Sequence, residues 1–369
     1  MKDTQSHHPP DDADITASDA QLTSGVSEMD VDPRSSPPRP PVAVNSHVTV
    51  EPDNDFGNDL DSIDEQMSQY SKSLTSSIVN YPVEYGRRYH AFRAGSYKFP
   101  NDEREMERLD LAHAMMVLAM GNKLYCSPLQ PERIQRVLDI GTGTGIWAIE
   151  MGDKFDHAEI NGIDLSNIQP DWIPPNVKFT IDDIESPWVD NKKYDFIMCR
   201  YMGASIQNWP GLMQNIYDHL SPGGWAEFQD VNTTFYSEDG SYTPEHATYK
   251  WMNTFVGACE STGRDPSVGP KLEGWVRSAG FDNVVAQGSK VPLGIWPKHP
   301  YYKQLGWMNL KLTLDGLEAL SLKLFSEMLN WTEEKITEEL EKVRAELQSG
   351  VFHALFDVHM VYGQKPLNK

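Results

Sequence analysis

The residues of this chain that could do chemistry centre on a glycine-rich turn. A short apolar run over residues 137–140 contains one acid, Asp139, and glycines follow at alternate positions, Gly141, Gly143 and Gly145. Glycine permits the backbone angles of a tight turn and lets a ligand approach the main chain. The spacing G-x-G-x-G differs from the G-x-G-x-x-G that lays a pyrophosphate on a helix end. An acid before the turn suits a cationic ligand better, although another nucleotide-binding unit or a plain turn is an alternative.

More acids follow two later apolar runs. Residues 158–164 read as a strand that ends in Asp164, where an acid accepts hydrogen bonds from ribose hydroxyls in folds of this kind. An acid just past the next strand, over residues 176–181, can accept from an adenine amino group. The alternative for Asp164 is a turn or helix cap. The residues expected to bind a cofactor are Asp139, Gly141, Gly143, Gly145, Asp164, Leu165, Asp182, Asp183, Ile184 and Arg200.

Three residues near the expected cleft could act as a general base: His113, Tyr201 and His246. His113 lies on the apolar face of a helix predicted from Asp102 to Gly121, with Glu105 completing a capping box. Tyr201 follows a predicted strand, and His246 falls at a predicted helix start. The structural alternative for each is a buried or capping side chain with no part in catalysis.

The elements that must position these residues alternate between strand and helix. Helical patterns begin at Ile146 and cover residues 210–220, 243–262 and 272–279. This alternation predicts an α/β fold, a doubly wound, mostly parallel sheet whose strand ends converge on one cleft. The predicted strands cover residues 137–140, 158–164, 176–181, 194–199, 225–231, 283–287 and 355–361.

The charge and composition exclude several classes of protein. The net charge is −22 and no basic stripe is present, so we expect no direct nucleic-acid contact. Cys126, Cys199 and Cys259 are too far apart for a disulfide framework or a zinc site, and we expect no metal. The sequence has no N-terminal apolar segment and no stretch long enough to span a bilayer, so we expect no membrane contact. We expect an intracellular protein, cytoplasmic, nuclear or both.

The chain divides by composition. Residues 1–80 are acidic and rich in Ser and Pro, contribute half of the net charge, and are predicted to be disordered. Residues 81–130 are predicted to form a helical lid, and residues 131–369 the main domain. A helical insertion is expected over residues 298–349, before the last strand. Its acidic stretch reads as a solvated helix face with i,i+4 pairs.

The combined motifs resemble the fungal LaeA-like class I methyltransferases, which use S-adenosylmethionine (SAM). The resemblance covers roughly Tyr81 to Pro366 and implies a methyltransferase fold with a reversed last strand. It also implies a link to secondary metabolism and, for the regulators in the family, velvet-type protein partners. The motifs are Tyr89-x3-Arg93-x-Gly95, Arg108-Leu109-Asp110, the glycine turn, Asp164-Leu-Ser-x-Ile-Gln-Pro170, Trp209-Pro210, Pro222-Gly-Gly224 and His353…Val361-Tyr-Gly363.

These observations favour a SAM-dependent methyltransferase for a small-molecule or protein acceptor. A regulatory protein with the same fold and weak or dispensable activity is the alternative, and the glycine spacing disfavours an NAD-dependent oxidoreductase. We further expect the N-terminal segment and the insertion to form one lid over the cofactor, with Tyr97, His113, Tyr201 and Trp307 controlling acceptor turnover.

Overall fold

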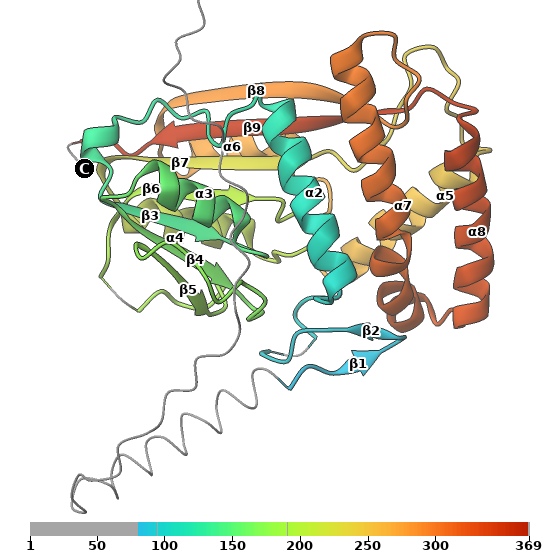
Figure 1. Ribbon diagram of the computed structural model, residues 1–369, viewed down its shortest axis with the longest axis horizontal. Coiled ribbons are helices and arrows are strands. Elements are labelled where there is room, and N and C mark those ends of the chain that lie inside the picture. Colours follow the sequence, from blue (N-terminus) through green and yellow to red (C-terminus); the bar gives the residue numbers. More distant parts are fainter. Residues whose placement is uncertain (1–79, 94, 190, 368–369) are drawn as a thin grey trace, which may run out of the picture. The chain divides into compact units, whose positions relative to one another are not determined.

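The computed structural model describes residues 80–367 except 94 and 190. Within this part, seven strands form one sheet in the order β5-β4-β3-β6-β7-β9-β8 (Figure 1). The first five of these strands pair in parallel, and β9 runs antiparallel to both of its neighbours. The doubly wound sheet with a reversed last strand is therefore confirmed. The strands are β3 (Arg136–Ile140), β4 (Glu159–Asp164), β5 (Val177–Ile181), β6 (Tyr194–Arg200), β7 (Leu220–Val231), β8 (Asp282–Pro292) and β9 (Leu355–Gln364).

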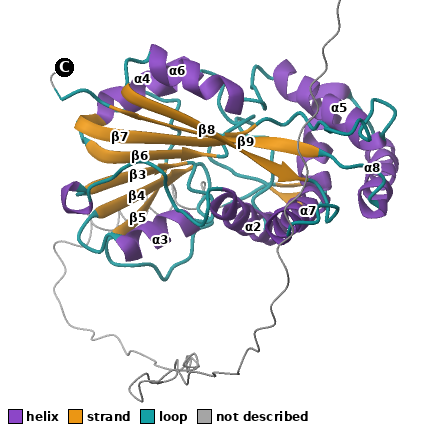
Figure 2. Cartoon of the chain, turned by 90° about the horizontal axis from the view of Figure 1, so that it is seen from above, coloured by secondary structure: helices purple, strands orange, loops and turns teal. Residues whose placement is uncertain are grey.

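Helices cover both faces of the sheet because its central strands are apolar on both sides. Val137 and Leu138 of β3 are fully buried and, being consecutive, point to opposite faces. Val137 packs with α3 (Ile146–Lys154), whereas Leu138 packs with α4 (Trp209–His219) and α6 (Leu272–Ser278). Figure 2 shows α3 on one face and α4 and α6 on the other. Burying each such side chain stabilises the fold by about 1.5–3 kcal/mol.

A second group of helices gathers at one end of the sheet and is called the helical cap here. It consists of α2 (Glu103–Ala119), α5 (Ala247–Ser261), α7 (Pro300–Leu329) and α8 (Glu333–Ser349) (Figures 1 and 2). Helix α7 packs against α2, α5 and α8. The helical insertion predicted over residues 298–349 is thus α7 and α8. The acidic helix α8 buries one stripe, which includes Ile336 and Leu340, and its outer face carries the i,i+4 pair Lys342–Glu338.

A small hairpin precedes α2 and was not predicted. It pairs β1 (Val83–Glu84) with β2 (Arg87–Arg88). Asp102 caps α2 as expected, because its side chain accepts from the Glu105 N–H at 3.1 Å. The reciprocal half of the predicted capping box is absent: the Glu105 carboxylate is held instead by Arg108, at 2.6 and 2.9 Å. Two 3-10 turns, η1 (Pro131–Arg133) and η2 (Gly269–Lys271), complete the described elements.

Two predictions about the rest of the chain have different outcomes. The turn predicted at residues 221–224 is instead part of β7, which begins at Leu220 and shows a register shift opposite Tyr194 and Phe196. The predicted disordered segment, residues 1–80, lies outside the described residues except for its last one. The three cysteines are unpaired, and Cys199 and Cys259 are buried.

Candidate active site

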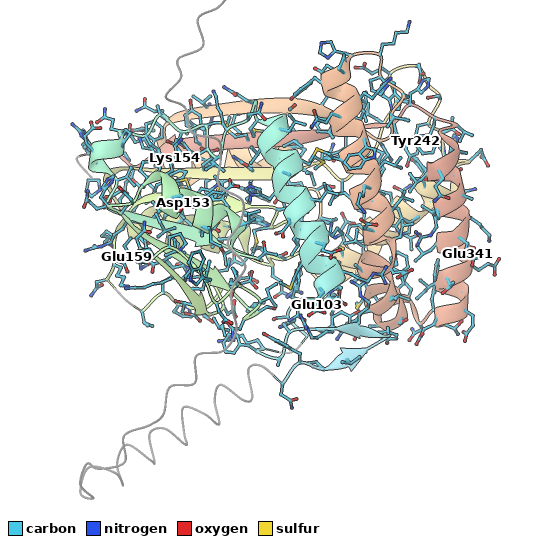
Figure 3. The ribbon with its side chains drawn as sticks, in the orientation of Figure 1. Glu103, Asp153, Lys154, Glu159, Tyr242 and Glu341 are labelled. Atoms are coloured by element: carbon cyan, nitrogen blue, oxygen red, sulfur yellow. The ribbon has the colours of Figure 1, made fainter. Side chains whose placement is uncertain are left out.

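A cavity of about 1080 Å³ lies where the carboxyl ends of the parallel strands meet the helical cap. The opposite edge of the sheet is marked in Figure 3 by Asp153 and Lys154 at the end of α3 and by Glu159 at the start of β4. Sequence reasoning placed the site at the carboxyl edge, and most of the chosen residues line this cavity. Those that do are Gly141, Gly143, Asp164, Leu165, Asp182, Asp183, Ile184, Arg200 and Tyr201.

The glycine turn is shaped by close contacts. Gly141 has φ +67°, and a Cβ there would lie 2.2 Å from the Met202 sulfur. Gly143 has φ +56°, and its N–H donates to Asp164 Oδ2 at 2.8 Å. Gly145 has φ +81°, and a Cβ there would lie 2.4 Å from the Phe179 ring. Gly145 does not line the cavity, so its role is packing rather than the expected ligand contact.

Asp139 also does not line the cavity, because the glycine turn covers its side chain. Its side chain is 4% exposed and accepts from Thr142 Oγ1 at 2.6 Å. Burial raises the pKa of Asp139 to about 7, although the Thr142 hydrogen bond lowers it. The expectation that Asp139 meets a cationic ligand directly is therefore wrong, because its carboxylate holds the turn and is covered by it.

Asp164 connects the second strand to the turn and keeps free acceptor capacity. Its Oδ1 accepts from the Ser166 N–H at 2.9 Å, while Oδ2 accepts from Gly143. The Leu165 N–H is a third backbone donor to this carboxylate. A carboxylate offers about four lone-pair sites, so about one remains for a ligand. The neighbouring Gln169 donates to the Gly143 carbonyl at 2.6 Å, which ties the Asp164 motif to the glycine turn. Burial raises the pKa of Asp164.

The two acids after β5 differ in their surroundings. Asp182 is exposed, whereas Asp183 is half-buried and accepts from the Glu185 N–H at 3.0 Å. Arg93, from the N-terminal segment, forms an ion pair with Asp183 at 3.2 Å. Ile184 is buried and lines the cavity. Of the two acids, Asp183 is therefore the one held in place, beside the apolar side chain of Ile184, and Arg93 of the N-terminal segment contacts it.

A chain of three polar side chains runs behind the turn. Arg200 Nη2 donates to His113 Nδ1 at 2.8 Å, and His113 Nε2 lies 3.2 Å from Glu150 Oε2. Nδ1 therefore accepts, and the neutral ring carries its proton on Nε2. Burial, and then the charge of Arg200, lowers the pKa of His113 to about 3. His113 has no free lone pair for a general base; it holds Arg200, whose buried Nη1 has no partner among the described residues.

The other two candidate bases have contrasting positions. Tyr201 lines the cavity with φ +59°, a backbone conformation that non-glycine residues rarely adopt. His246 does not line it: this residue is the N-cap of α5, and its Nδ1 accepts from the Thr243 N–H at 3.0 Å. Its ring stacks on Tyr242, which lies beside the ends of α7 and α8 (Figure 3). The placement of His246 near the cleft was therefore wrong.

Residues that sequence reasoning did not assign to the site also belong to it. The Arg108-Leu109-Asp110 motif lies on α2, where Asp110 accepts from Thr144 Oγ1 at 2.6 Å and Leu109 packs near Gly143. The motif thus fixes the helical cap on the glycine turn. Asp230 lines the cavity at the end of β7. An acid at the carboxyl end of a strand is the signal that selected Asp164, and it could have selected Asp230.

The two segments expected to form a lid both reach the cavity. Tyr97 and Phe99 line it from the N-terminal segment, and Asn309 and Leu312 line it from α7. Trp307, by contrast, is 52% exposed and does not line the cavity. Trp307 was therefore wrongly chosen as a residue that contacts the acceptor, because it falls on the outer face of α7.

The sheet order, the reversed last strand and the cleft at the glycine turn define a class I methyltransferase fold. The chain matches the family described as methyltransferase domain over residues 111–286. It is 44% identical over 320 residues to the methyltransferase pytC of Aspergillus terreus, which covers 86% of this chain and 98% of that protein.

Two further relatives carry regulatory or enzymatic names. The secondary metabolism regulator LAE1 of Cochliobolus heterostrophus is 37% identical, over 78% of this chain and 95% of that protein. The protein-methionine methyltransferase laeA of Emericella nidulans is 31% identical, over 80% and 79%. The chain belongs to the fungal LaeA-like family of SAM-dependent class I methyltransferases.

None of the helices in residues 80–367 is long and apolar enough to cross a membrane. In the same part of the chain, no three His, Cys, Asp or Glu side chains are grouped so that they could hold a metal ion.

Proposed function

We propose that the residues lining the glycine-turn end of the cavity hold SAM. Asp164 would accept from the ribose hydroxyls, and Asp183 with Ile184 would receive the adenine; Leu165 and Asp182 line the same end. The fit is supported by the unpartnered Nη1 of Arg200, a buried donor suited to a carboxylate. It is also supported by the positive φ angles of Gly141 and Gly143, which bring bare backbone to the cavity wall.

The bound cofactor supplies a methyl group on a sulfonium, and the protein's task is mainly to position its acceptor. Holding two reacting groups close and aligned can supply roughly 7–11 kcal/mol of the barrier. Asp110 and Leu109 would keep α2 against the turn, so that the helical cap excludes water from the reacting centre. Residues 81–130 and 298–349 would together form one lid that selects the acceptor.

The acceptor we propose is a small organic molecule of fungal secondary metabolism. The observation that carries this is the size of the cavity, about 1080 Å³, which extends beyond the glycine turn into the helical cap. Sites for one small molecule usually measure roughly 300–1,000 Å³. A cavity above that range can hold the cofactor and a second compact molecule together.

A regulatory role is the second candidate function. Relatives of this chain are named as secondary metabolism regulators, and one is named as a protein-methionine methyltransferase. In that case the acceptor would be a protein, the partners would be velvet-type proteins and the compartment would include the nucleus. Methyl transfer would then be weak or dispensable for the biological role.

Calorimetry of the purified protein with SAM, S-adenosylhomocysteine and NAD tests the proposed cofactor site. We expect one molecule of either sulfur compound to bind per chain and NAD not to bind. Formation of S-adenosylhomocysteine should then depend on addition of a fungal small-molecule extract. Binding of NAD in preference to SAM would contradict the proposal, and product formation only with added protein would favour the regulatory candidate.

A further inference from the structure

Beyond the glycine turn the cavity continues as an apolar compartment. Its walls come from distant parts of the chain, including the segment before α2, the loop after β7, helix α5 and strand β9. The aromatic side chains are each buried to at least nine-tenths and give the compartment an apolar wall. Such a wall suits a compact molecule with a ring system rather than an extended polar chain. The lining aromatic residues are Phe99, Phe235, Trp251, Phe255 and Phe356.

Donor groups gather where the compartment meets the cofactor end. Burial raises the pKa values of both Tyr97 and Tyr201, although the charge of Arg108 lowers them, and Arg108 also donates a hydrogen bond to Tyr201. Both tyrosines are therefore neutral O–H donors at physiological pH. The Tyr97 hydroxyl has no hydrogen-bond partner among the described residues, and the residue lines the cavity. An unused donor at the edge of an apolar wall is suited to a ligand oxygen.

The charges at this border also limit the ligand. The Glu105 carboxylate pairs with Arg108 through two hydrogen bonds, so the pair is neutral overall. A charged acceptor would lose its hydration against the apolar wall of the compartment. A neutral oxygen that becomes negative during the reaction would instead be stabilised by the tyrosine and guanidinium donors.

Asp230, near the end of β7, lines this part of the cavity and can take a proton. Its Oδ2 accepts from the Met202 and Gly203 N–H groups, at 2.7 and 2.9 Å, whereas Oδ1 accepts only from the Val231 N–H at 2.8 Å. Oδ1 therefore keeps an open lone pair. Burial raises the pKa of Asp230 to about 7, although these three backbone groups lower it.

The groups that face Asp230 do not supply a positive charge. Cys199 and Tyr201 on the neighbouring strand end are both neutral, since burial raises their pKa values. Asp265, from the loop before η2, adds a negative charge. Among residues 80–367 the structure shows no ion pair to Asp230. Its carboxylate is therefore free to act as a base at neutral pH.

We propose that the apolar compartment binds a small, neutral, ring-bearing molecule through a hydroxyl group, and that Asp230 is the base for methylation of that hydroxyl. This rests on the proposed function. The acceptor O–H bond breaks and its proton moves to Asp230, while the oxygen forms a bond to the methyl carbon. The sulfur keeps the electrons of the broken carbon–sulfur bond and leaves as S-adenosylhomocysteine. Protonated Asp230 then returns its proton to water.

The first test measures binding to the full chain loaded with S-adenosylhomocysteine, with 2-naphthol and naphthalene as probes. Calorimetry should show that 2-naphthol binds about 3- to 10-fold more tightly, as expected for one neutral hydrogen bond. Tyr97→Phe should reduce this preference to less than about 2-fold. Tyr302→Phe, an exposed tyrosine outside the cavity, is the matched control and should keep it. Equal binding of both probes to the unaltered chain would overturn the inference.

The second test measures transfer of labelled methyl from SAM to 2-naphthol. Asp230→Asn should lower the rate by about 10²- to 10⁴-fold and keep probe affinity within about 3-fold. The unaltered chain should gain rate up to about pH 7 and then level off, whereas the residual rate of the variant should not follow this curve. No transfer to 2-naphthol, or full activity in Asp230→Asn, would overturn the inference.

Controls separate this inference from the function on which it rests. Asp195→Asn is the matched control, since Asp195 also accepts from two backbone N–H groups, of Gln135 and Arg136, but at the opposite edge of the sheet. It should leave transfer unchanged. If S-adenosylhomocysteine itself does not bind, the proposed function fails. If S-adenosylhomocysteine binds and 2-naphthol does not, only the acceptor inference fails. Should Asp230→Asn not fold, Tyr97→Phe alone decides whether the compartment binds the acceptor through a hydroxyl group.

Discussion

Replacing Asp164 should separate the ribose acceptor from the rest of the cofactor site. The carboxylate already accepts from Gly143 and Ser166, at 2.8 and 2.9 Å, and also from the Leu165 N–H, and it retains acceptor capacity for the ribose. Asp164→Ala removes one or two charge-assisted hydrogen bonds to the ribose, a loss of about 2–4 kcal/mol. SAM affinity should fall by about 30- to 1,000-fold. Asp164→Asn should lose less, although its amide must turn a donor toward one of the two backbone N–H groups.

Calorimetry with both SAM and S-adenosylhomocysteine is the assay for this prediction. Both compounds carry the ribose but only SAM carries the sulfonium, so a ribose role weakens both by the same factor. A larger loss for SAM would mean that Asp164 acts through its charge. Asp171→Asn, an exposed acid in the following loop, is the control and should change nothing. A folded Asp164→Ala protein that binds both compounds normally would refute the assignment.

Two side chains behind the glycine turn and the N-terminal segment can each be tested in the same way. His113→Phe should weaken SAM binding by about 10-fold, since a charged hydrogen bond to Arg200 is lost, and His113→Gln, which keeps an acceptor, should lose less. The pKa of His113 is about 3, so its charge does not change between pH 5 and 9. A pH-dependent SAM affinity in this range that disappears in the variant would contradict the positioning role. The pKa of Asp139 rises from 3.8 to about 7 on folding, so its contribution to stability is full below about pH 4 and is lost as the pH rises through 7. Between these pH values, thermal unfolding should show the free energy of unfolding of Asp139→Asn rising by up to roughly 4 kcal/mol relative to that of the unaltered chain. Parallel stability curves for the two proteins would disprove this prediction. A chain shortened to begin at Ser77 should bind SAM within about 2-fold of the full chain, since every residue that lines the cavity lies at Arg93 or beyond. Loss of SAM binding would show a role for the removed segment.

Sequence reasoning located the site because its logic depends on topology alone. Parallel strands bring their carboxyl ends to one edge, so acids such as Asp164 and Asp183 could be placed together without knowledge of any side-chain contact. Asp230 satisfies the same rule and was overlooked, since the strand that it ends was read only for its apolar pattern. The cofactor followed from the glycine spacing and from the family resemblance.

What could not be predicted depends on contacts between distant segments. Whether Asp139 faces the ligand or the Thr142 hydroxyl depends on how the turn folds back, which brings the two side chains to 2.6 Å. His246 could be placed at a helix start, but only the fold shows that this start points away from the cavity. Trp307 was expected inside because it is large and apolar, yet a helix as long as α7 has an outer face too.

The central claim is that this protein transfers a methyl group from SAM to a small molecule held in the cavity. The most direct measurement incubates the purified full chain with methyl-labelled SAM and a fungal extract that contains both small molecules and proteins, and then separates the products by size. We expect the label in an organic-soluble small molecule, with much less there for Asp164→Ala at the same SAM concentration. Label found only in protein, or in no product although SAM binds, would contradict the claim.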